Sequence, residues 1–352
     1  MSSAVPIGEA RHPVRALLAP ALYLLGCLVA IALVVGISVG IGDMPIPLAT
    51  TYLAISNKLG WTSAELDRIH ETVIWEYRLS RSLVAVFCGA GLALCGAIMQ
   101  SMLRNPLAEP YVLGISAGAS TGAVAVVILG IGAGVVSLSA GAFIGAFAAF
   151  FLVALLSNGA RGGADRTILA GVAASQLFNA ATAYVVTTSG NAQQARDVMF
   201  WLLGSFGGVR WPEFALVSVV VGLGLVACLF YSRVLDAFAF GDEAAASLGV
   251  NVGPTRIILF ALTATMTATI VSMVGTIGFV GLVVPHAARF VVGPLHARLL
   301  PACAIAGAIF MVLADIASRT LIPQQVLPIG VVTALVGVPF FSVILYRLQR
   351  AS

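Results

Sequence analysis

The most conspicuous shortage in this sequence is charge. Of its 352 residues, 9% are charged and 60% are hydrophobic, and the mean hydropathy is +1.05. A soluble globule of this length would need far more polar surface. The composition therefore predicts a polytopic membrane protein, and because one span takes roughly 20 apolar residues, there is room for about eight to ten spans and for no sizeable soluble domain.

Lysine is almost absent, and its absence excludes a class of chemistry. Lys58 is the only lysine, and the pattern GxxxxGK[ST] does not occur. The chain therefore cannot build a P-loop, so it is not expected to be an ATPase and no catalytic residues are predicted. Gly114-Ile-Ser116-Ala-Gly118 fits the pattern of a hydrolase nucleophile, but it opens an apolar helical run rather than following a strand, so we interpret its small residues as packing.

Clustered basic residues and paired cysteines are also missing. The net charge is +4, but the arginines are scattered between apolar runs, which argues against nucleic acid as a partner. No two cysteines have CxxC spacing, so neither a disulfide nor a metal site is expected. All five cysteines lie within apolar runs: Cys27, Cys88, Cys95, Cys228 and Cys303.

Acidic residues are scarce inside the apolar runs. Of the fourteen acids, only Asp315 lies inside a predicted span, near its end, since Glu213 is the first residue of the span that it opens. An ion-coupled secondary transporter, the alternative from another class, would need carboxylates near the middle of the bilayer. Asp315 and Arg319 stand four residues apart, which predicts an ion pair within one helix.

What the sequence does contain is a series of apolar runs, and they predict an all-α integral membrane protein that forms one transmembrane domain over residues 1–352. The first run is too long for a signal peptide and is kept as a span. Small residues four apart, at Gly36/Gly40, Gly118/Gly122, Gly130/Gly134 and Gly141/Gly145, predict close helix packing. The predicted spans are 16–42, 82–101, 111–132, 135–157, 167–188, 213–232, 256–275, 278–292, 301–318 and 326–346.

The orientation follows from the basic residues. With the tail of about residues 1–15 in the cytoplasm, eleven basic residues lie inside and seven outside, which favours cytoplasmic termini. The segment 43–75 is then an external loop with a short surface helix. The segment 191–211, which carries Arg196, Met199 and Trp201, is predicted to be a re-entrant or interfacial helix near a pore mouth.

Residues 78–120 organise the chain. Two apolar runs flank a polar loop with Pro106 and Pro110, which predicts a membrane hairpin. Arg78 and Arg81 lie three apart at the start of the first run, so their side chains leave one helix face. The stretch, RLSRSLVAVFCGAGLALCGAIMQSMLRNPLAEPYVLGISAGAS, resembles the signature of the FecCD permeases, with Arg-Leu-Ser-Arg in place of the family's usual Arg-Leu-Pro-Arg.

That resemblance implies the BtuC-like permease fold of ten spans, in the membrane subunit of an importer for iron-siderophores, haem or cobalamin. An iron chelate is the expected cargo and cobalamin the alternative. The implied partners are ATP-binding cassette ATPase subunits, which bind ATP and Mg, a periplasmic binding protein, and a second permease subunit in a homodimer or, alternatively, a heterodimer. The implied location is the bacterial inner membrane, and this chain is expected to bind no cofactor or metal.

Further site residues come from the same resemblance. Arg78, Arg81 and Arg319 match positions that face outward and dock the binding protein, where an arginine fork suits carboxylates. The segment 236–255 matches the coupling helix that contacts the ATPase. Asp242 and Glu243 open its helix and Gly249 and Gly253 are expected to end it. Its predicted contact residues are Asp242, Glu243, Leu248, Gly249 and Gly253.

A second matching stretch covers residues 275–289. Gly275, Gly278 and Gly281 are three apart and predict one smooth helix face that contributes to gating or to the translocation path. His286, next to Pro285, is interpreted as part of a helix end. A metal ligand or proton relay is the alternative for this histidine.

Overall fold

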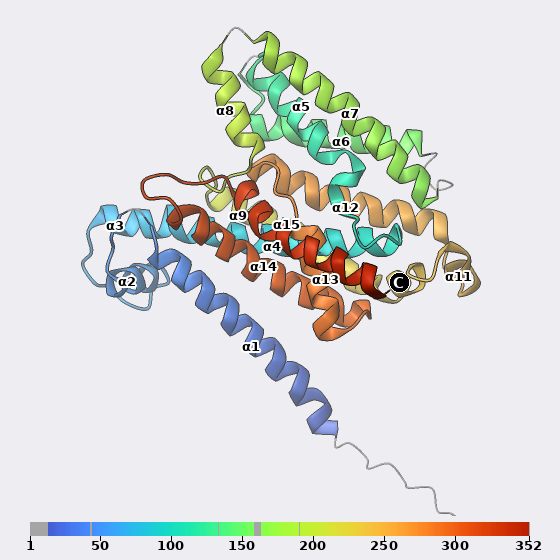
Figure 1. Cartoon of the computed structure of the whole chain (residues 1–352). Helices are drawn as coiled ribbons and strands as arrows, with labels where there is room; N and C mark the ends of the chain where they lie inside the picture. The colour runs from blue at the N-terminus through green and yellow to red at the C-terminus, as the bar shows by residue number, and fades with distance from the viewer. Residues whose placement is uncertain (1–12, 43, 133, 158–162, 190, 352) are drawn as a thin grey trace, which may run out of the picture.

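The computed structural model describes residues 13–42, 44–132, 134–157, 163–189 and 191–351, and these form a bundle of helices (Figure 1). Most of the predicted cytoplasmic tail, residues 1–12, lies outside the described part. The helices are α1 (Pro13–Gly40), α2 (Leu48–Lys58), α3 (Arg68–Thr72), η1 (Val73–Leu79), α4 (Ser80–Met102), η2 (Pro110–Leu113), α5 (Ile115–Val127), α6 (Leu138–Leu156), α7 (Ala164–Thr188), α8 (Ala192–Leu202), α9 (Trp211–Phe230), α10 (Ser232–Phe238), α11 (Asp242–Ser247), α12 (Val252–Val274), α13 (Val280–Val292), α14 (His296–Thr320) and α15 (Ile329–Ala351).

The ten predicted spans are confirmed as ten apolar helical segments. Six are long and apolar enough to cross a membrane: the run from α3 to α4, α6, α7, α9, α12 and α14. Four shorter apolar segments, Leu25–Gly40, Ile115–Val127, Val280–Val292 and Ile329–Val343, account for the other predicted spans. The fold is the predicted all-α membrane fold.

The two ends of the bundle differ. Figure 1 shows α2 and α3 at one end, called here the α2–α3 end, and α11 at the opposite end, called the α11 end. Helix α1 begins on the α11 side and finishes beside α2, and α15 finishes on the α11 side (Figure 1). Helices α5 to α8 lie together above the central helices, while α1 lies along the opposite margin (Figure 1).

The segment expected to be an external loop is more helical than predicted. It contains α2 and α3, and α3 continues through the π-helical turn η1 into α4, so the helix begins well before residue 82. The reason is packing: Ile74 is fully buried, and the Trp75 ring lies 4.8 Å from the Trp211 ring at the start of α9. An apolar stripe that finds a neighbouring helix stays helical where hydropathy alone suggests a loop end.

Helix α4 is the core of the molecule. In the run that ends with α4, 78% of the apolar window is buried, against 22% to 28% in α6, α7 and α9. Its neighbours are α1, α9, α10, α12, α13 and α14. A helix that is apolar all round belongs inside a bundle, whereas the outer helices expose large side chains such as Leu155, Leu177 and Leu223, as lipid or a second subunit requires.

Glycines bring helix backbones into contact at two of the four predicted pairs. On α5, Gly118 and Gly122 face Gly145 and Gly141 of α6, and a Cβ at Gly118 would lie 2.3 Å from the Gly145 carbonyl oxygen. The predicted pairs at Gly36/Gly40 and Gly130/Gly134 do not pack in this way. Gly36 has open space beside it, and Gly130 and Gly134 lie in a turn with positive φ.

Two further glycine contacts surround α4. A Cβ at Gly89 would lie 2.1 Å from the Gly307 carbonyl oxygen of α14, and one at Gly96 would lie 1.9 Å from the Gly281 carbonyl oxygen of α13. Neither position can accept a side chain without moving a neighbouring backbone, so α4, α13 and α14 are packed backbone to backbone.

Replacing Gly118 with alanine should destabilise the α5–α6 pair, by about 1–3 kcal/mol for an overpacked contact. Thermal unfolding in detergent measures it. The matched control is Gly222→Ala on α9, where a Cβ meets nothing within 4 Å, so its unfolding midpoint should stay level or rise. Equal midpoints for the two variants would contradict the backbone contact.

Candidate functional site

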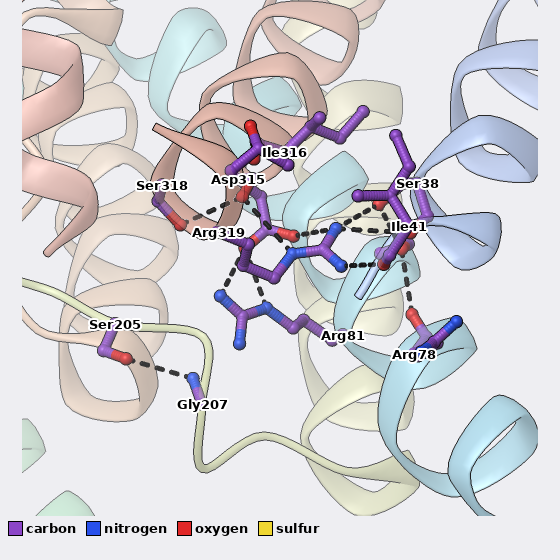
Figure 2. Close-up of polar contacts among 12 residues, drawn as sticks. Ser38, Ile41, Arg78, Arg81, Ser205, Gly207, Asp315, Ile316, Ser318 and Arg319 are labelled. Atoms are coloured by element: carbon purple, nitrogen blue, oxygen red, sulfur yellow. Dashed lines mark hydrogen bonds and ion pairs between the residues drawn. The ribbon is translucent and has the colours of Figure 1, made fainter. Parts of the chain in front are cut away.

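A cluster of three arginines and one aspartate lies at the α2–α3 end, and we call it the arginine cluster: Arg78, Arg81, Asp315 and Arg319 (Figure 2). Asp315 is fully buried on α14. Arg81 on α4 reaches its Oδ1 through Nε at 2.8 Å and Nη2 at 2.7 Å, and Arg319 Nη2 lies 2.9 Å from Oδ2. The predicted ion pair between Asp315 and Arg319 is confirmed, and Arg81 is an additional partner that spacing did not indicate.

The same cluster closes the end of α1. Arg319 donates to the carbonyl of Ile41 and, at 2.9 Å, to the hydroxyl of Ser38. Arg78 donates at 3.2 Å to the carbonyl of Val39 and also to that of Met44. The last carbonyls of a helix have no partner within the helix, so two guanidinium groups, from η1 and α14, supply the missing donors at the end of α1.

The side chains of these arginines turn into the protein rather than out of it. The side chains of Arg81 and Arg319 are 14% and 9% exposed, and Arg78 is buried. Asp315 is the acid in the cluster, so three guanidinium groups and one carboxylate leave a net charge of +2 within the cluster itself. Their docking role therefore stays a prediction.

Removing the Asp315 carboxylate should destabilise the α2–α3 end of the protein. Asp315→Ala leaves two guanidinium groups without their counter-ion, and breaking a buried ion pair costs about 3–5 kcal/mol. Thermal unfolding in detergent should show a large drop in midpoint. Glu65→Gln, at an exposed position of the same end, is the control, and an Asp315→Ala midpoint equal to that of this control would contradict the stabilising role of the cluster.

At the α11 end, the predicted coupling segment forms α10 and α11 joined by a short turn. Asp242 lies in the first turn of α11, and its carboxylate pairs with Arg256 of α12. Glu243 is exposed next to it. Gly249 has φ +85° just after the helix, as predicted for its end, but Gly253 does not end it, since it lies in the first turn of α12.

The segment exposes apolar side chains. Leu248 is 72% exposed and Phe240 is 80% exposed, one on each side of α11. Ala245 is buried and holds the short helix against the body. Apolar side chains presented on an otherwise polar turn are suited to a groove on a partner.

A second polar link, which the sequence analysis missed, joins this segment to α4 and α14. Asp236 of α10 accepts the backbone N–H of His296 at 2.9 Å, and its Oδ1 lies 2.6 Å from the His296 Nδ1. The other ring nitrogen lies 2.6 Å from the hydroxyl of Ser101 on α4. No spacing rule relates residues 101, 236 and 296, so only the fold could bring them together.

Helices α4 and α14 are therefore tied at both ends. Arg81 and Asp315 join them at the α2–α3 end, and Ser101 and His296 join them at the α11 end. The close approach at Gly89 fixes the middle. Because each contact resists sliding of one helix along the other, the pair connects the two faces of the protein as one unit.

The predicted path residues lie on α8, in the turn after α12 and, for Gly281, on α13. Arg196 and Met199 are exposed on α8, where Arg196 donates to Gln193. Trp201 is partly buried near the end of α8, and a Cβ at Gly275 would lie 2.1 Å from its carbonyl oxygen. Within 191–211, α8 forms a helix at Ala192–Leu202, and its position near a pore mouth stays a prediction.

The prediction of one smooth helix face at the three glycines was wrong. Gly275, with φ +74°, ends α12, and residues 276–279 are not helical. Only Gly281 lies in a helix, where it packs on α4. Hydropathy cannot detect this break because both flanking segments are apolar.

An apolar groove of about 550 Å³ lies where α15 starts beside the end of α8. The backbone N–H groups of Ile329 and Gly330 donate to the carbonyls of Gly204 and Leu203. The hydroxyl of Thr276 donates a hydrogen bond to the carbonyl of Leu202. The groove is lined by Leu203, Gly330, Val331, Ala334, Leu335, Val338 and Pro339.

His286 lies on α13, with its ring 5.1 Å from that of Phe290 in an edge-to-face contact. Together with Arg289, it lines a cavity at the α11 end. Within the described ranges, no three His, Cys, Asp or Glu side chains are grouped so as to hold a metal ion.

Comparison with known proteins gives matches along most of the chain. The model of the FecCD transport family matches residues 28–347. The cobalamin import system permease protein BtuC of Halobacterium salinarum is 37% identical, covering 86% of this chain and 80% of the relative. FecD, the Fe(3+) dicitrate permease protein of Escherichia coli, is 38% identical (80% and 87%), and the hemin permease protein HmuU of Yersinia pestis is 36% identical (84% and 89%).

Solved structures agree with the fold. One described as an inward-facing conformation of a metal-chelate type ABC transporter superimposes with a TM-score of 0.80 at 30% identity, covering 93% of this chain and 99% of the other. PsaBC from Streptococcus pneumoniae in complex with Fab gives a TM-score of 0.54 at 19% identity, covering 75% and 89%, and so shares the fold.

Proposed function

The chain belongs to the FecCD transport family and is the permease subunit of an ABC importer, and we propose that its cargo is an iron chelate, either an iron-siderophore or haem. The similarity to FecD and HmuU, and to a transporter of the metal-chelate type, supports this cargo. Cobalamin is the second candidate, because a cobalamin permease is as similar to this chain as those two relatives are.

This subunit has exposed apolar surfaces that suit each of the proposed partners. The exposed Leu248 and Phe240 on either side of α11 suit a groove on an ATPase subunit. The apolar groove at α15 and the exposed leucines of the outer helices suit a second copy of the permease, with a path between the two. A homodimer is proposed, in which α8, the turn at Gly275 and the start of α15 contribute to that path.

The orientation proposed is α11 in the cytoplasm and α2–α3 outside, in the bacterial inner membrane. Helix α1 begins and α15 ends on the α11 side (Figure 1), which agrees with cytoplasmic termini and the excess of basic residues inside. In this orientation the coupling segment meets the ATPase and the arginine cluster meets the binding protein.

Transport would then join two events at opposite faces. Closure of the ATPase dimer on ATP displaces the coupling segment, and the Asp236–His296 link carries the displacement to α14 and α4. A change in the positions of these helices alters the path beside α8 and α15, which is alternating access by population shift.

The cargo is tested with the assembled importer. The permease and its ATPase subunits are reconstituted and presented with binding proteins loaded with a ferric siderophore, haem or cobalamin, and ATP hydrolysis and cargo uptake are measured. An iron chelate that stimulates both supports the proposal. Stimulation by cobalamin alone would replace the iron chelate with the second candidate, while uptake driven by membrane potential without ATP would contradict an importer of this class.

Substituting Leu248 should uncouple the two activities. Leu248→Glu places a charge where we propose an apolar contact, and uptake should fall about tenfold, which lies within the usual range of coupling energies. Co-purification with the ATPase should fall in parallel. Ser247→Ala, at the neighbouring exposed position, is the control, and unchanged uptake with Leu248→Glu would remove this segment from the ATPase contact.

Docking through the arginine cluster should depend on charge. Arg81→Lys keeps the charge and Arg81→Gln removes it, so Arg81→Gln should weaken capture of the binding protein by about fivefold more than Arg81→Lys. Arg68→Gln removes a charge from exposed α3 at the same end and serves as the control. Affinity measured beside the unfolding midpoint separates docking from folding, and equal losses for Arg68→Gln and Arg81→Gln would show that no specific contact exists at Arg81.

A further inference from the structure

A cavity of about 340 Å³ that has charged side chains in its lining opens at the α11 end between α4, α13 and the start of α14. Two guanidinium groups face it, those of Arg104 and Arg289, together with the imidazoles of His286 and His296. Of the described residues that line the cavity, none is Asp or Glu. A cavity with two fixed positive charges and no lining carboxylate is suited to an anion.

One of the two guanidinium groups is held in place. Arg289 donates to the side-chain oxygen of Gln100. The amide nitrogen of Gln100 in turn donates to the carbonyls of Gly281 and Leu282 at 3.1 and 3.3 Å. Because a guanidinium has five N–H donors, Arg289 can be fixed by Gln100 and still donate into the cavity.

The histidines contribute less. Both ring nitrogens of His296 are engaged, one by Ser101 and the other by Asp236. Asp236 is the nearby carboxylate, and its Oδ1 is taken up by the ring and the backbone N–H of His296. The permanently charged groups left to bind an anion are the guanidinium groups of Arg104 and Arg289, beside the imidazole of His286.

Arg104 sits in an unusual backbone conformation. Its φ is +47°, in the left-handed region where glycine and asparagine are favoured. Its guanidinium makes no hydrogen bond or ion pair with another described residue, and it lies against Gly241, where a Cβ would be 3.2 Å from Nη1. Arg104 is exposed, so its charge is open to a ligand that enters the cavity, and its backbone conformation makes it a candidate for a functional role.

The rim beside Arg289 is apolar. Phe290 and Val291, the next two residues of α13, are 74% and 82% exposed, and Leu295 is 55% exposed. A free inorganic anion or an acidic protein side chain has no need of such a rim. A phospholipid has both halves, a phosphate for the guanidinium groups and acyl chains for the apolar residues.

We propose that this cavity binds the phosphate headgroup of an anionic phospholipid from the cytoplasmic leaflet, with its acyl chains lying on Phe290 and Val291. The assignment to that leaflet rests on the proposed orientation, in which the α11 end is cytoplasmic. The guanidinium groups of Arg104 and Arg289 would bind the phosphate. A lipid bound here would lie beside Gly241, at the base of the proposed coupling segment.

The test is lipid binding by the purified importer in detergent. Phosphatidylglycerol and phosphatidylcholine are titrated separately, and bound lipid is counted by native mass spectrometry beside the unfolding midpoint. Phosphatidylglycerol should be retained and should raise the midpoint more than phosphatidylcholine does. Equal retention of the two lipids would overturn the proposal.

Variants locate the site. Arg104→Asn removes the charge and suits the left-handed backbone, so the protein should stay folded while phosphatidylglycerol binding weakens about fivefold, as one arginine near the surface contributes. Arg289→Gln should weaken it similarly. Arg298→Gln, an exposed arginine on α14 outside the cavity, is the matched control, and an equal loss in this variant would show only general attraction and overturn the site.

Two further measurements distinguish a lipid from other negatively charged ligands. Inorganic phosphate that raises the midpoint as far as phosphatidylglycerol does would assign the cavity to a free anion instead of a lipid. Loss of ATPase co-purification in Arg104→Asn, with phosphatidylglycerol binding unchanged, would assign it to an acidic residue of the partner. Lipid counts do not depend on which cargo is transported, so failure here and failure of the proposed function are distinguishable.

Discussion

The buried carboxylate of Asp315 is the interaction on which the arrangement of this protein depends. It lies where water is excluded, so it is stable only because Arg81 and Arg319 supply its counter-charge from two helices. The Arg319 guanidinium, together with that of Arg78, completes the hydrogen bonding at the end of α1. One charge thus determines how three helices meet, because none of these groups can move away alone without leaving an unpaired charge or carbonyl in an apolar surrounding.

Helices α4 and α14 are also held together at the end opposite Asp315. Their polar side chains are concentrated at the two ends, at Arg81 and Asp315 on one side and at Ser101 and His296 on the other, while glycines occupy the close contact in between. Within a membrane, burial of apolar side chains contributes little to helix association, because the surrounding lipid is equally apolar. Backbone contact and terminal hydrogen bonds therefore hold the pair, and they also make it a mechanical connection between the face of the proposed binding protein and the face of the proposed ATPase.

Exposed features are divided between the two ends and the sides. The sides expose leucine, valine and phenylalanine, which suits lipid and a second permease subunit. The α11 end combines exposed Leu248 with the cationic cavity at Arg104 and Arg289. Protein partner and membrane thus have separate surfaces next to each other, and both adjoin the segment through which ATP-driven movement would enter.

The sequence by itself determined the class of protein, the ten apolar segments, the helix at α11 and the pairing of Asp315 with Arg319, because each depends on composition or on neighbours three or four residues away. Family membership was also readable there, from the residues around the two arginines of the first hairpin. Only the tertiary structure decided that Arg81 shares the same carboxylate, that His296 joins Asp236 to Ser101, and that the glycines around Gly275 are split by a break in the helix. These depend on residues tens to hundreds of positions apart, or on a turn between two equally apolar helices, and hydrophobic periodicity contains no information on either.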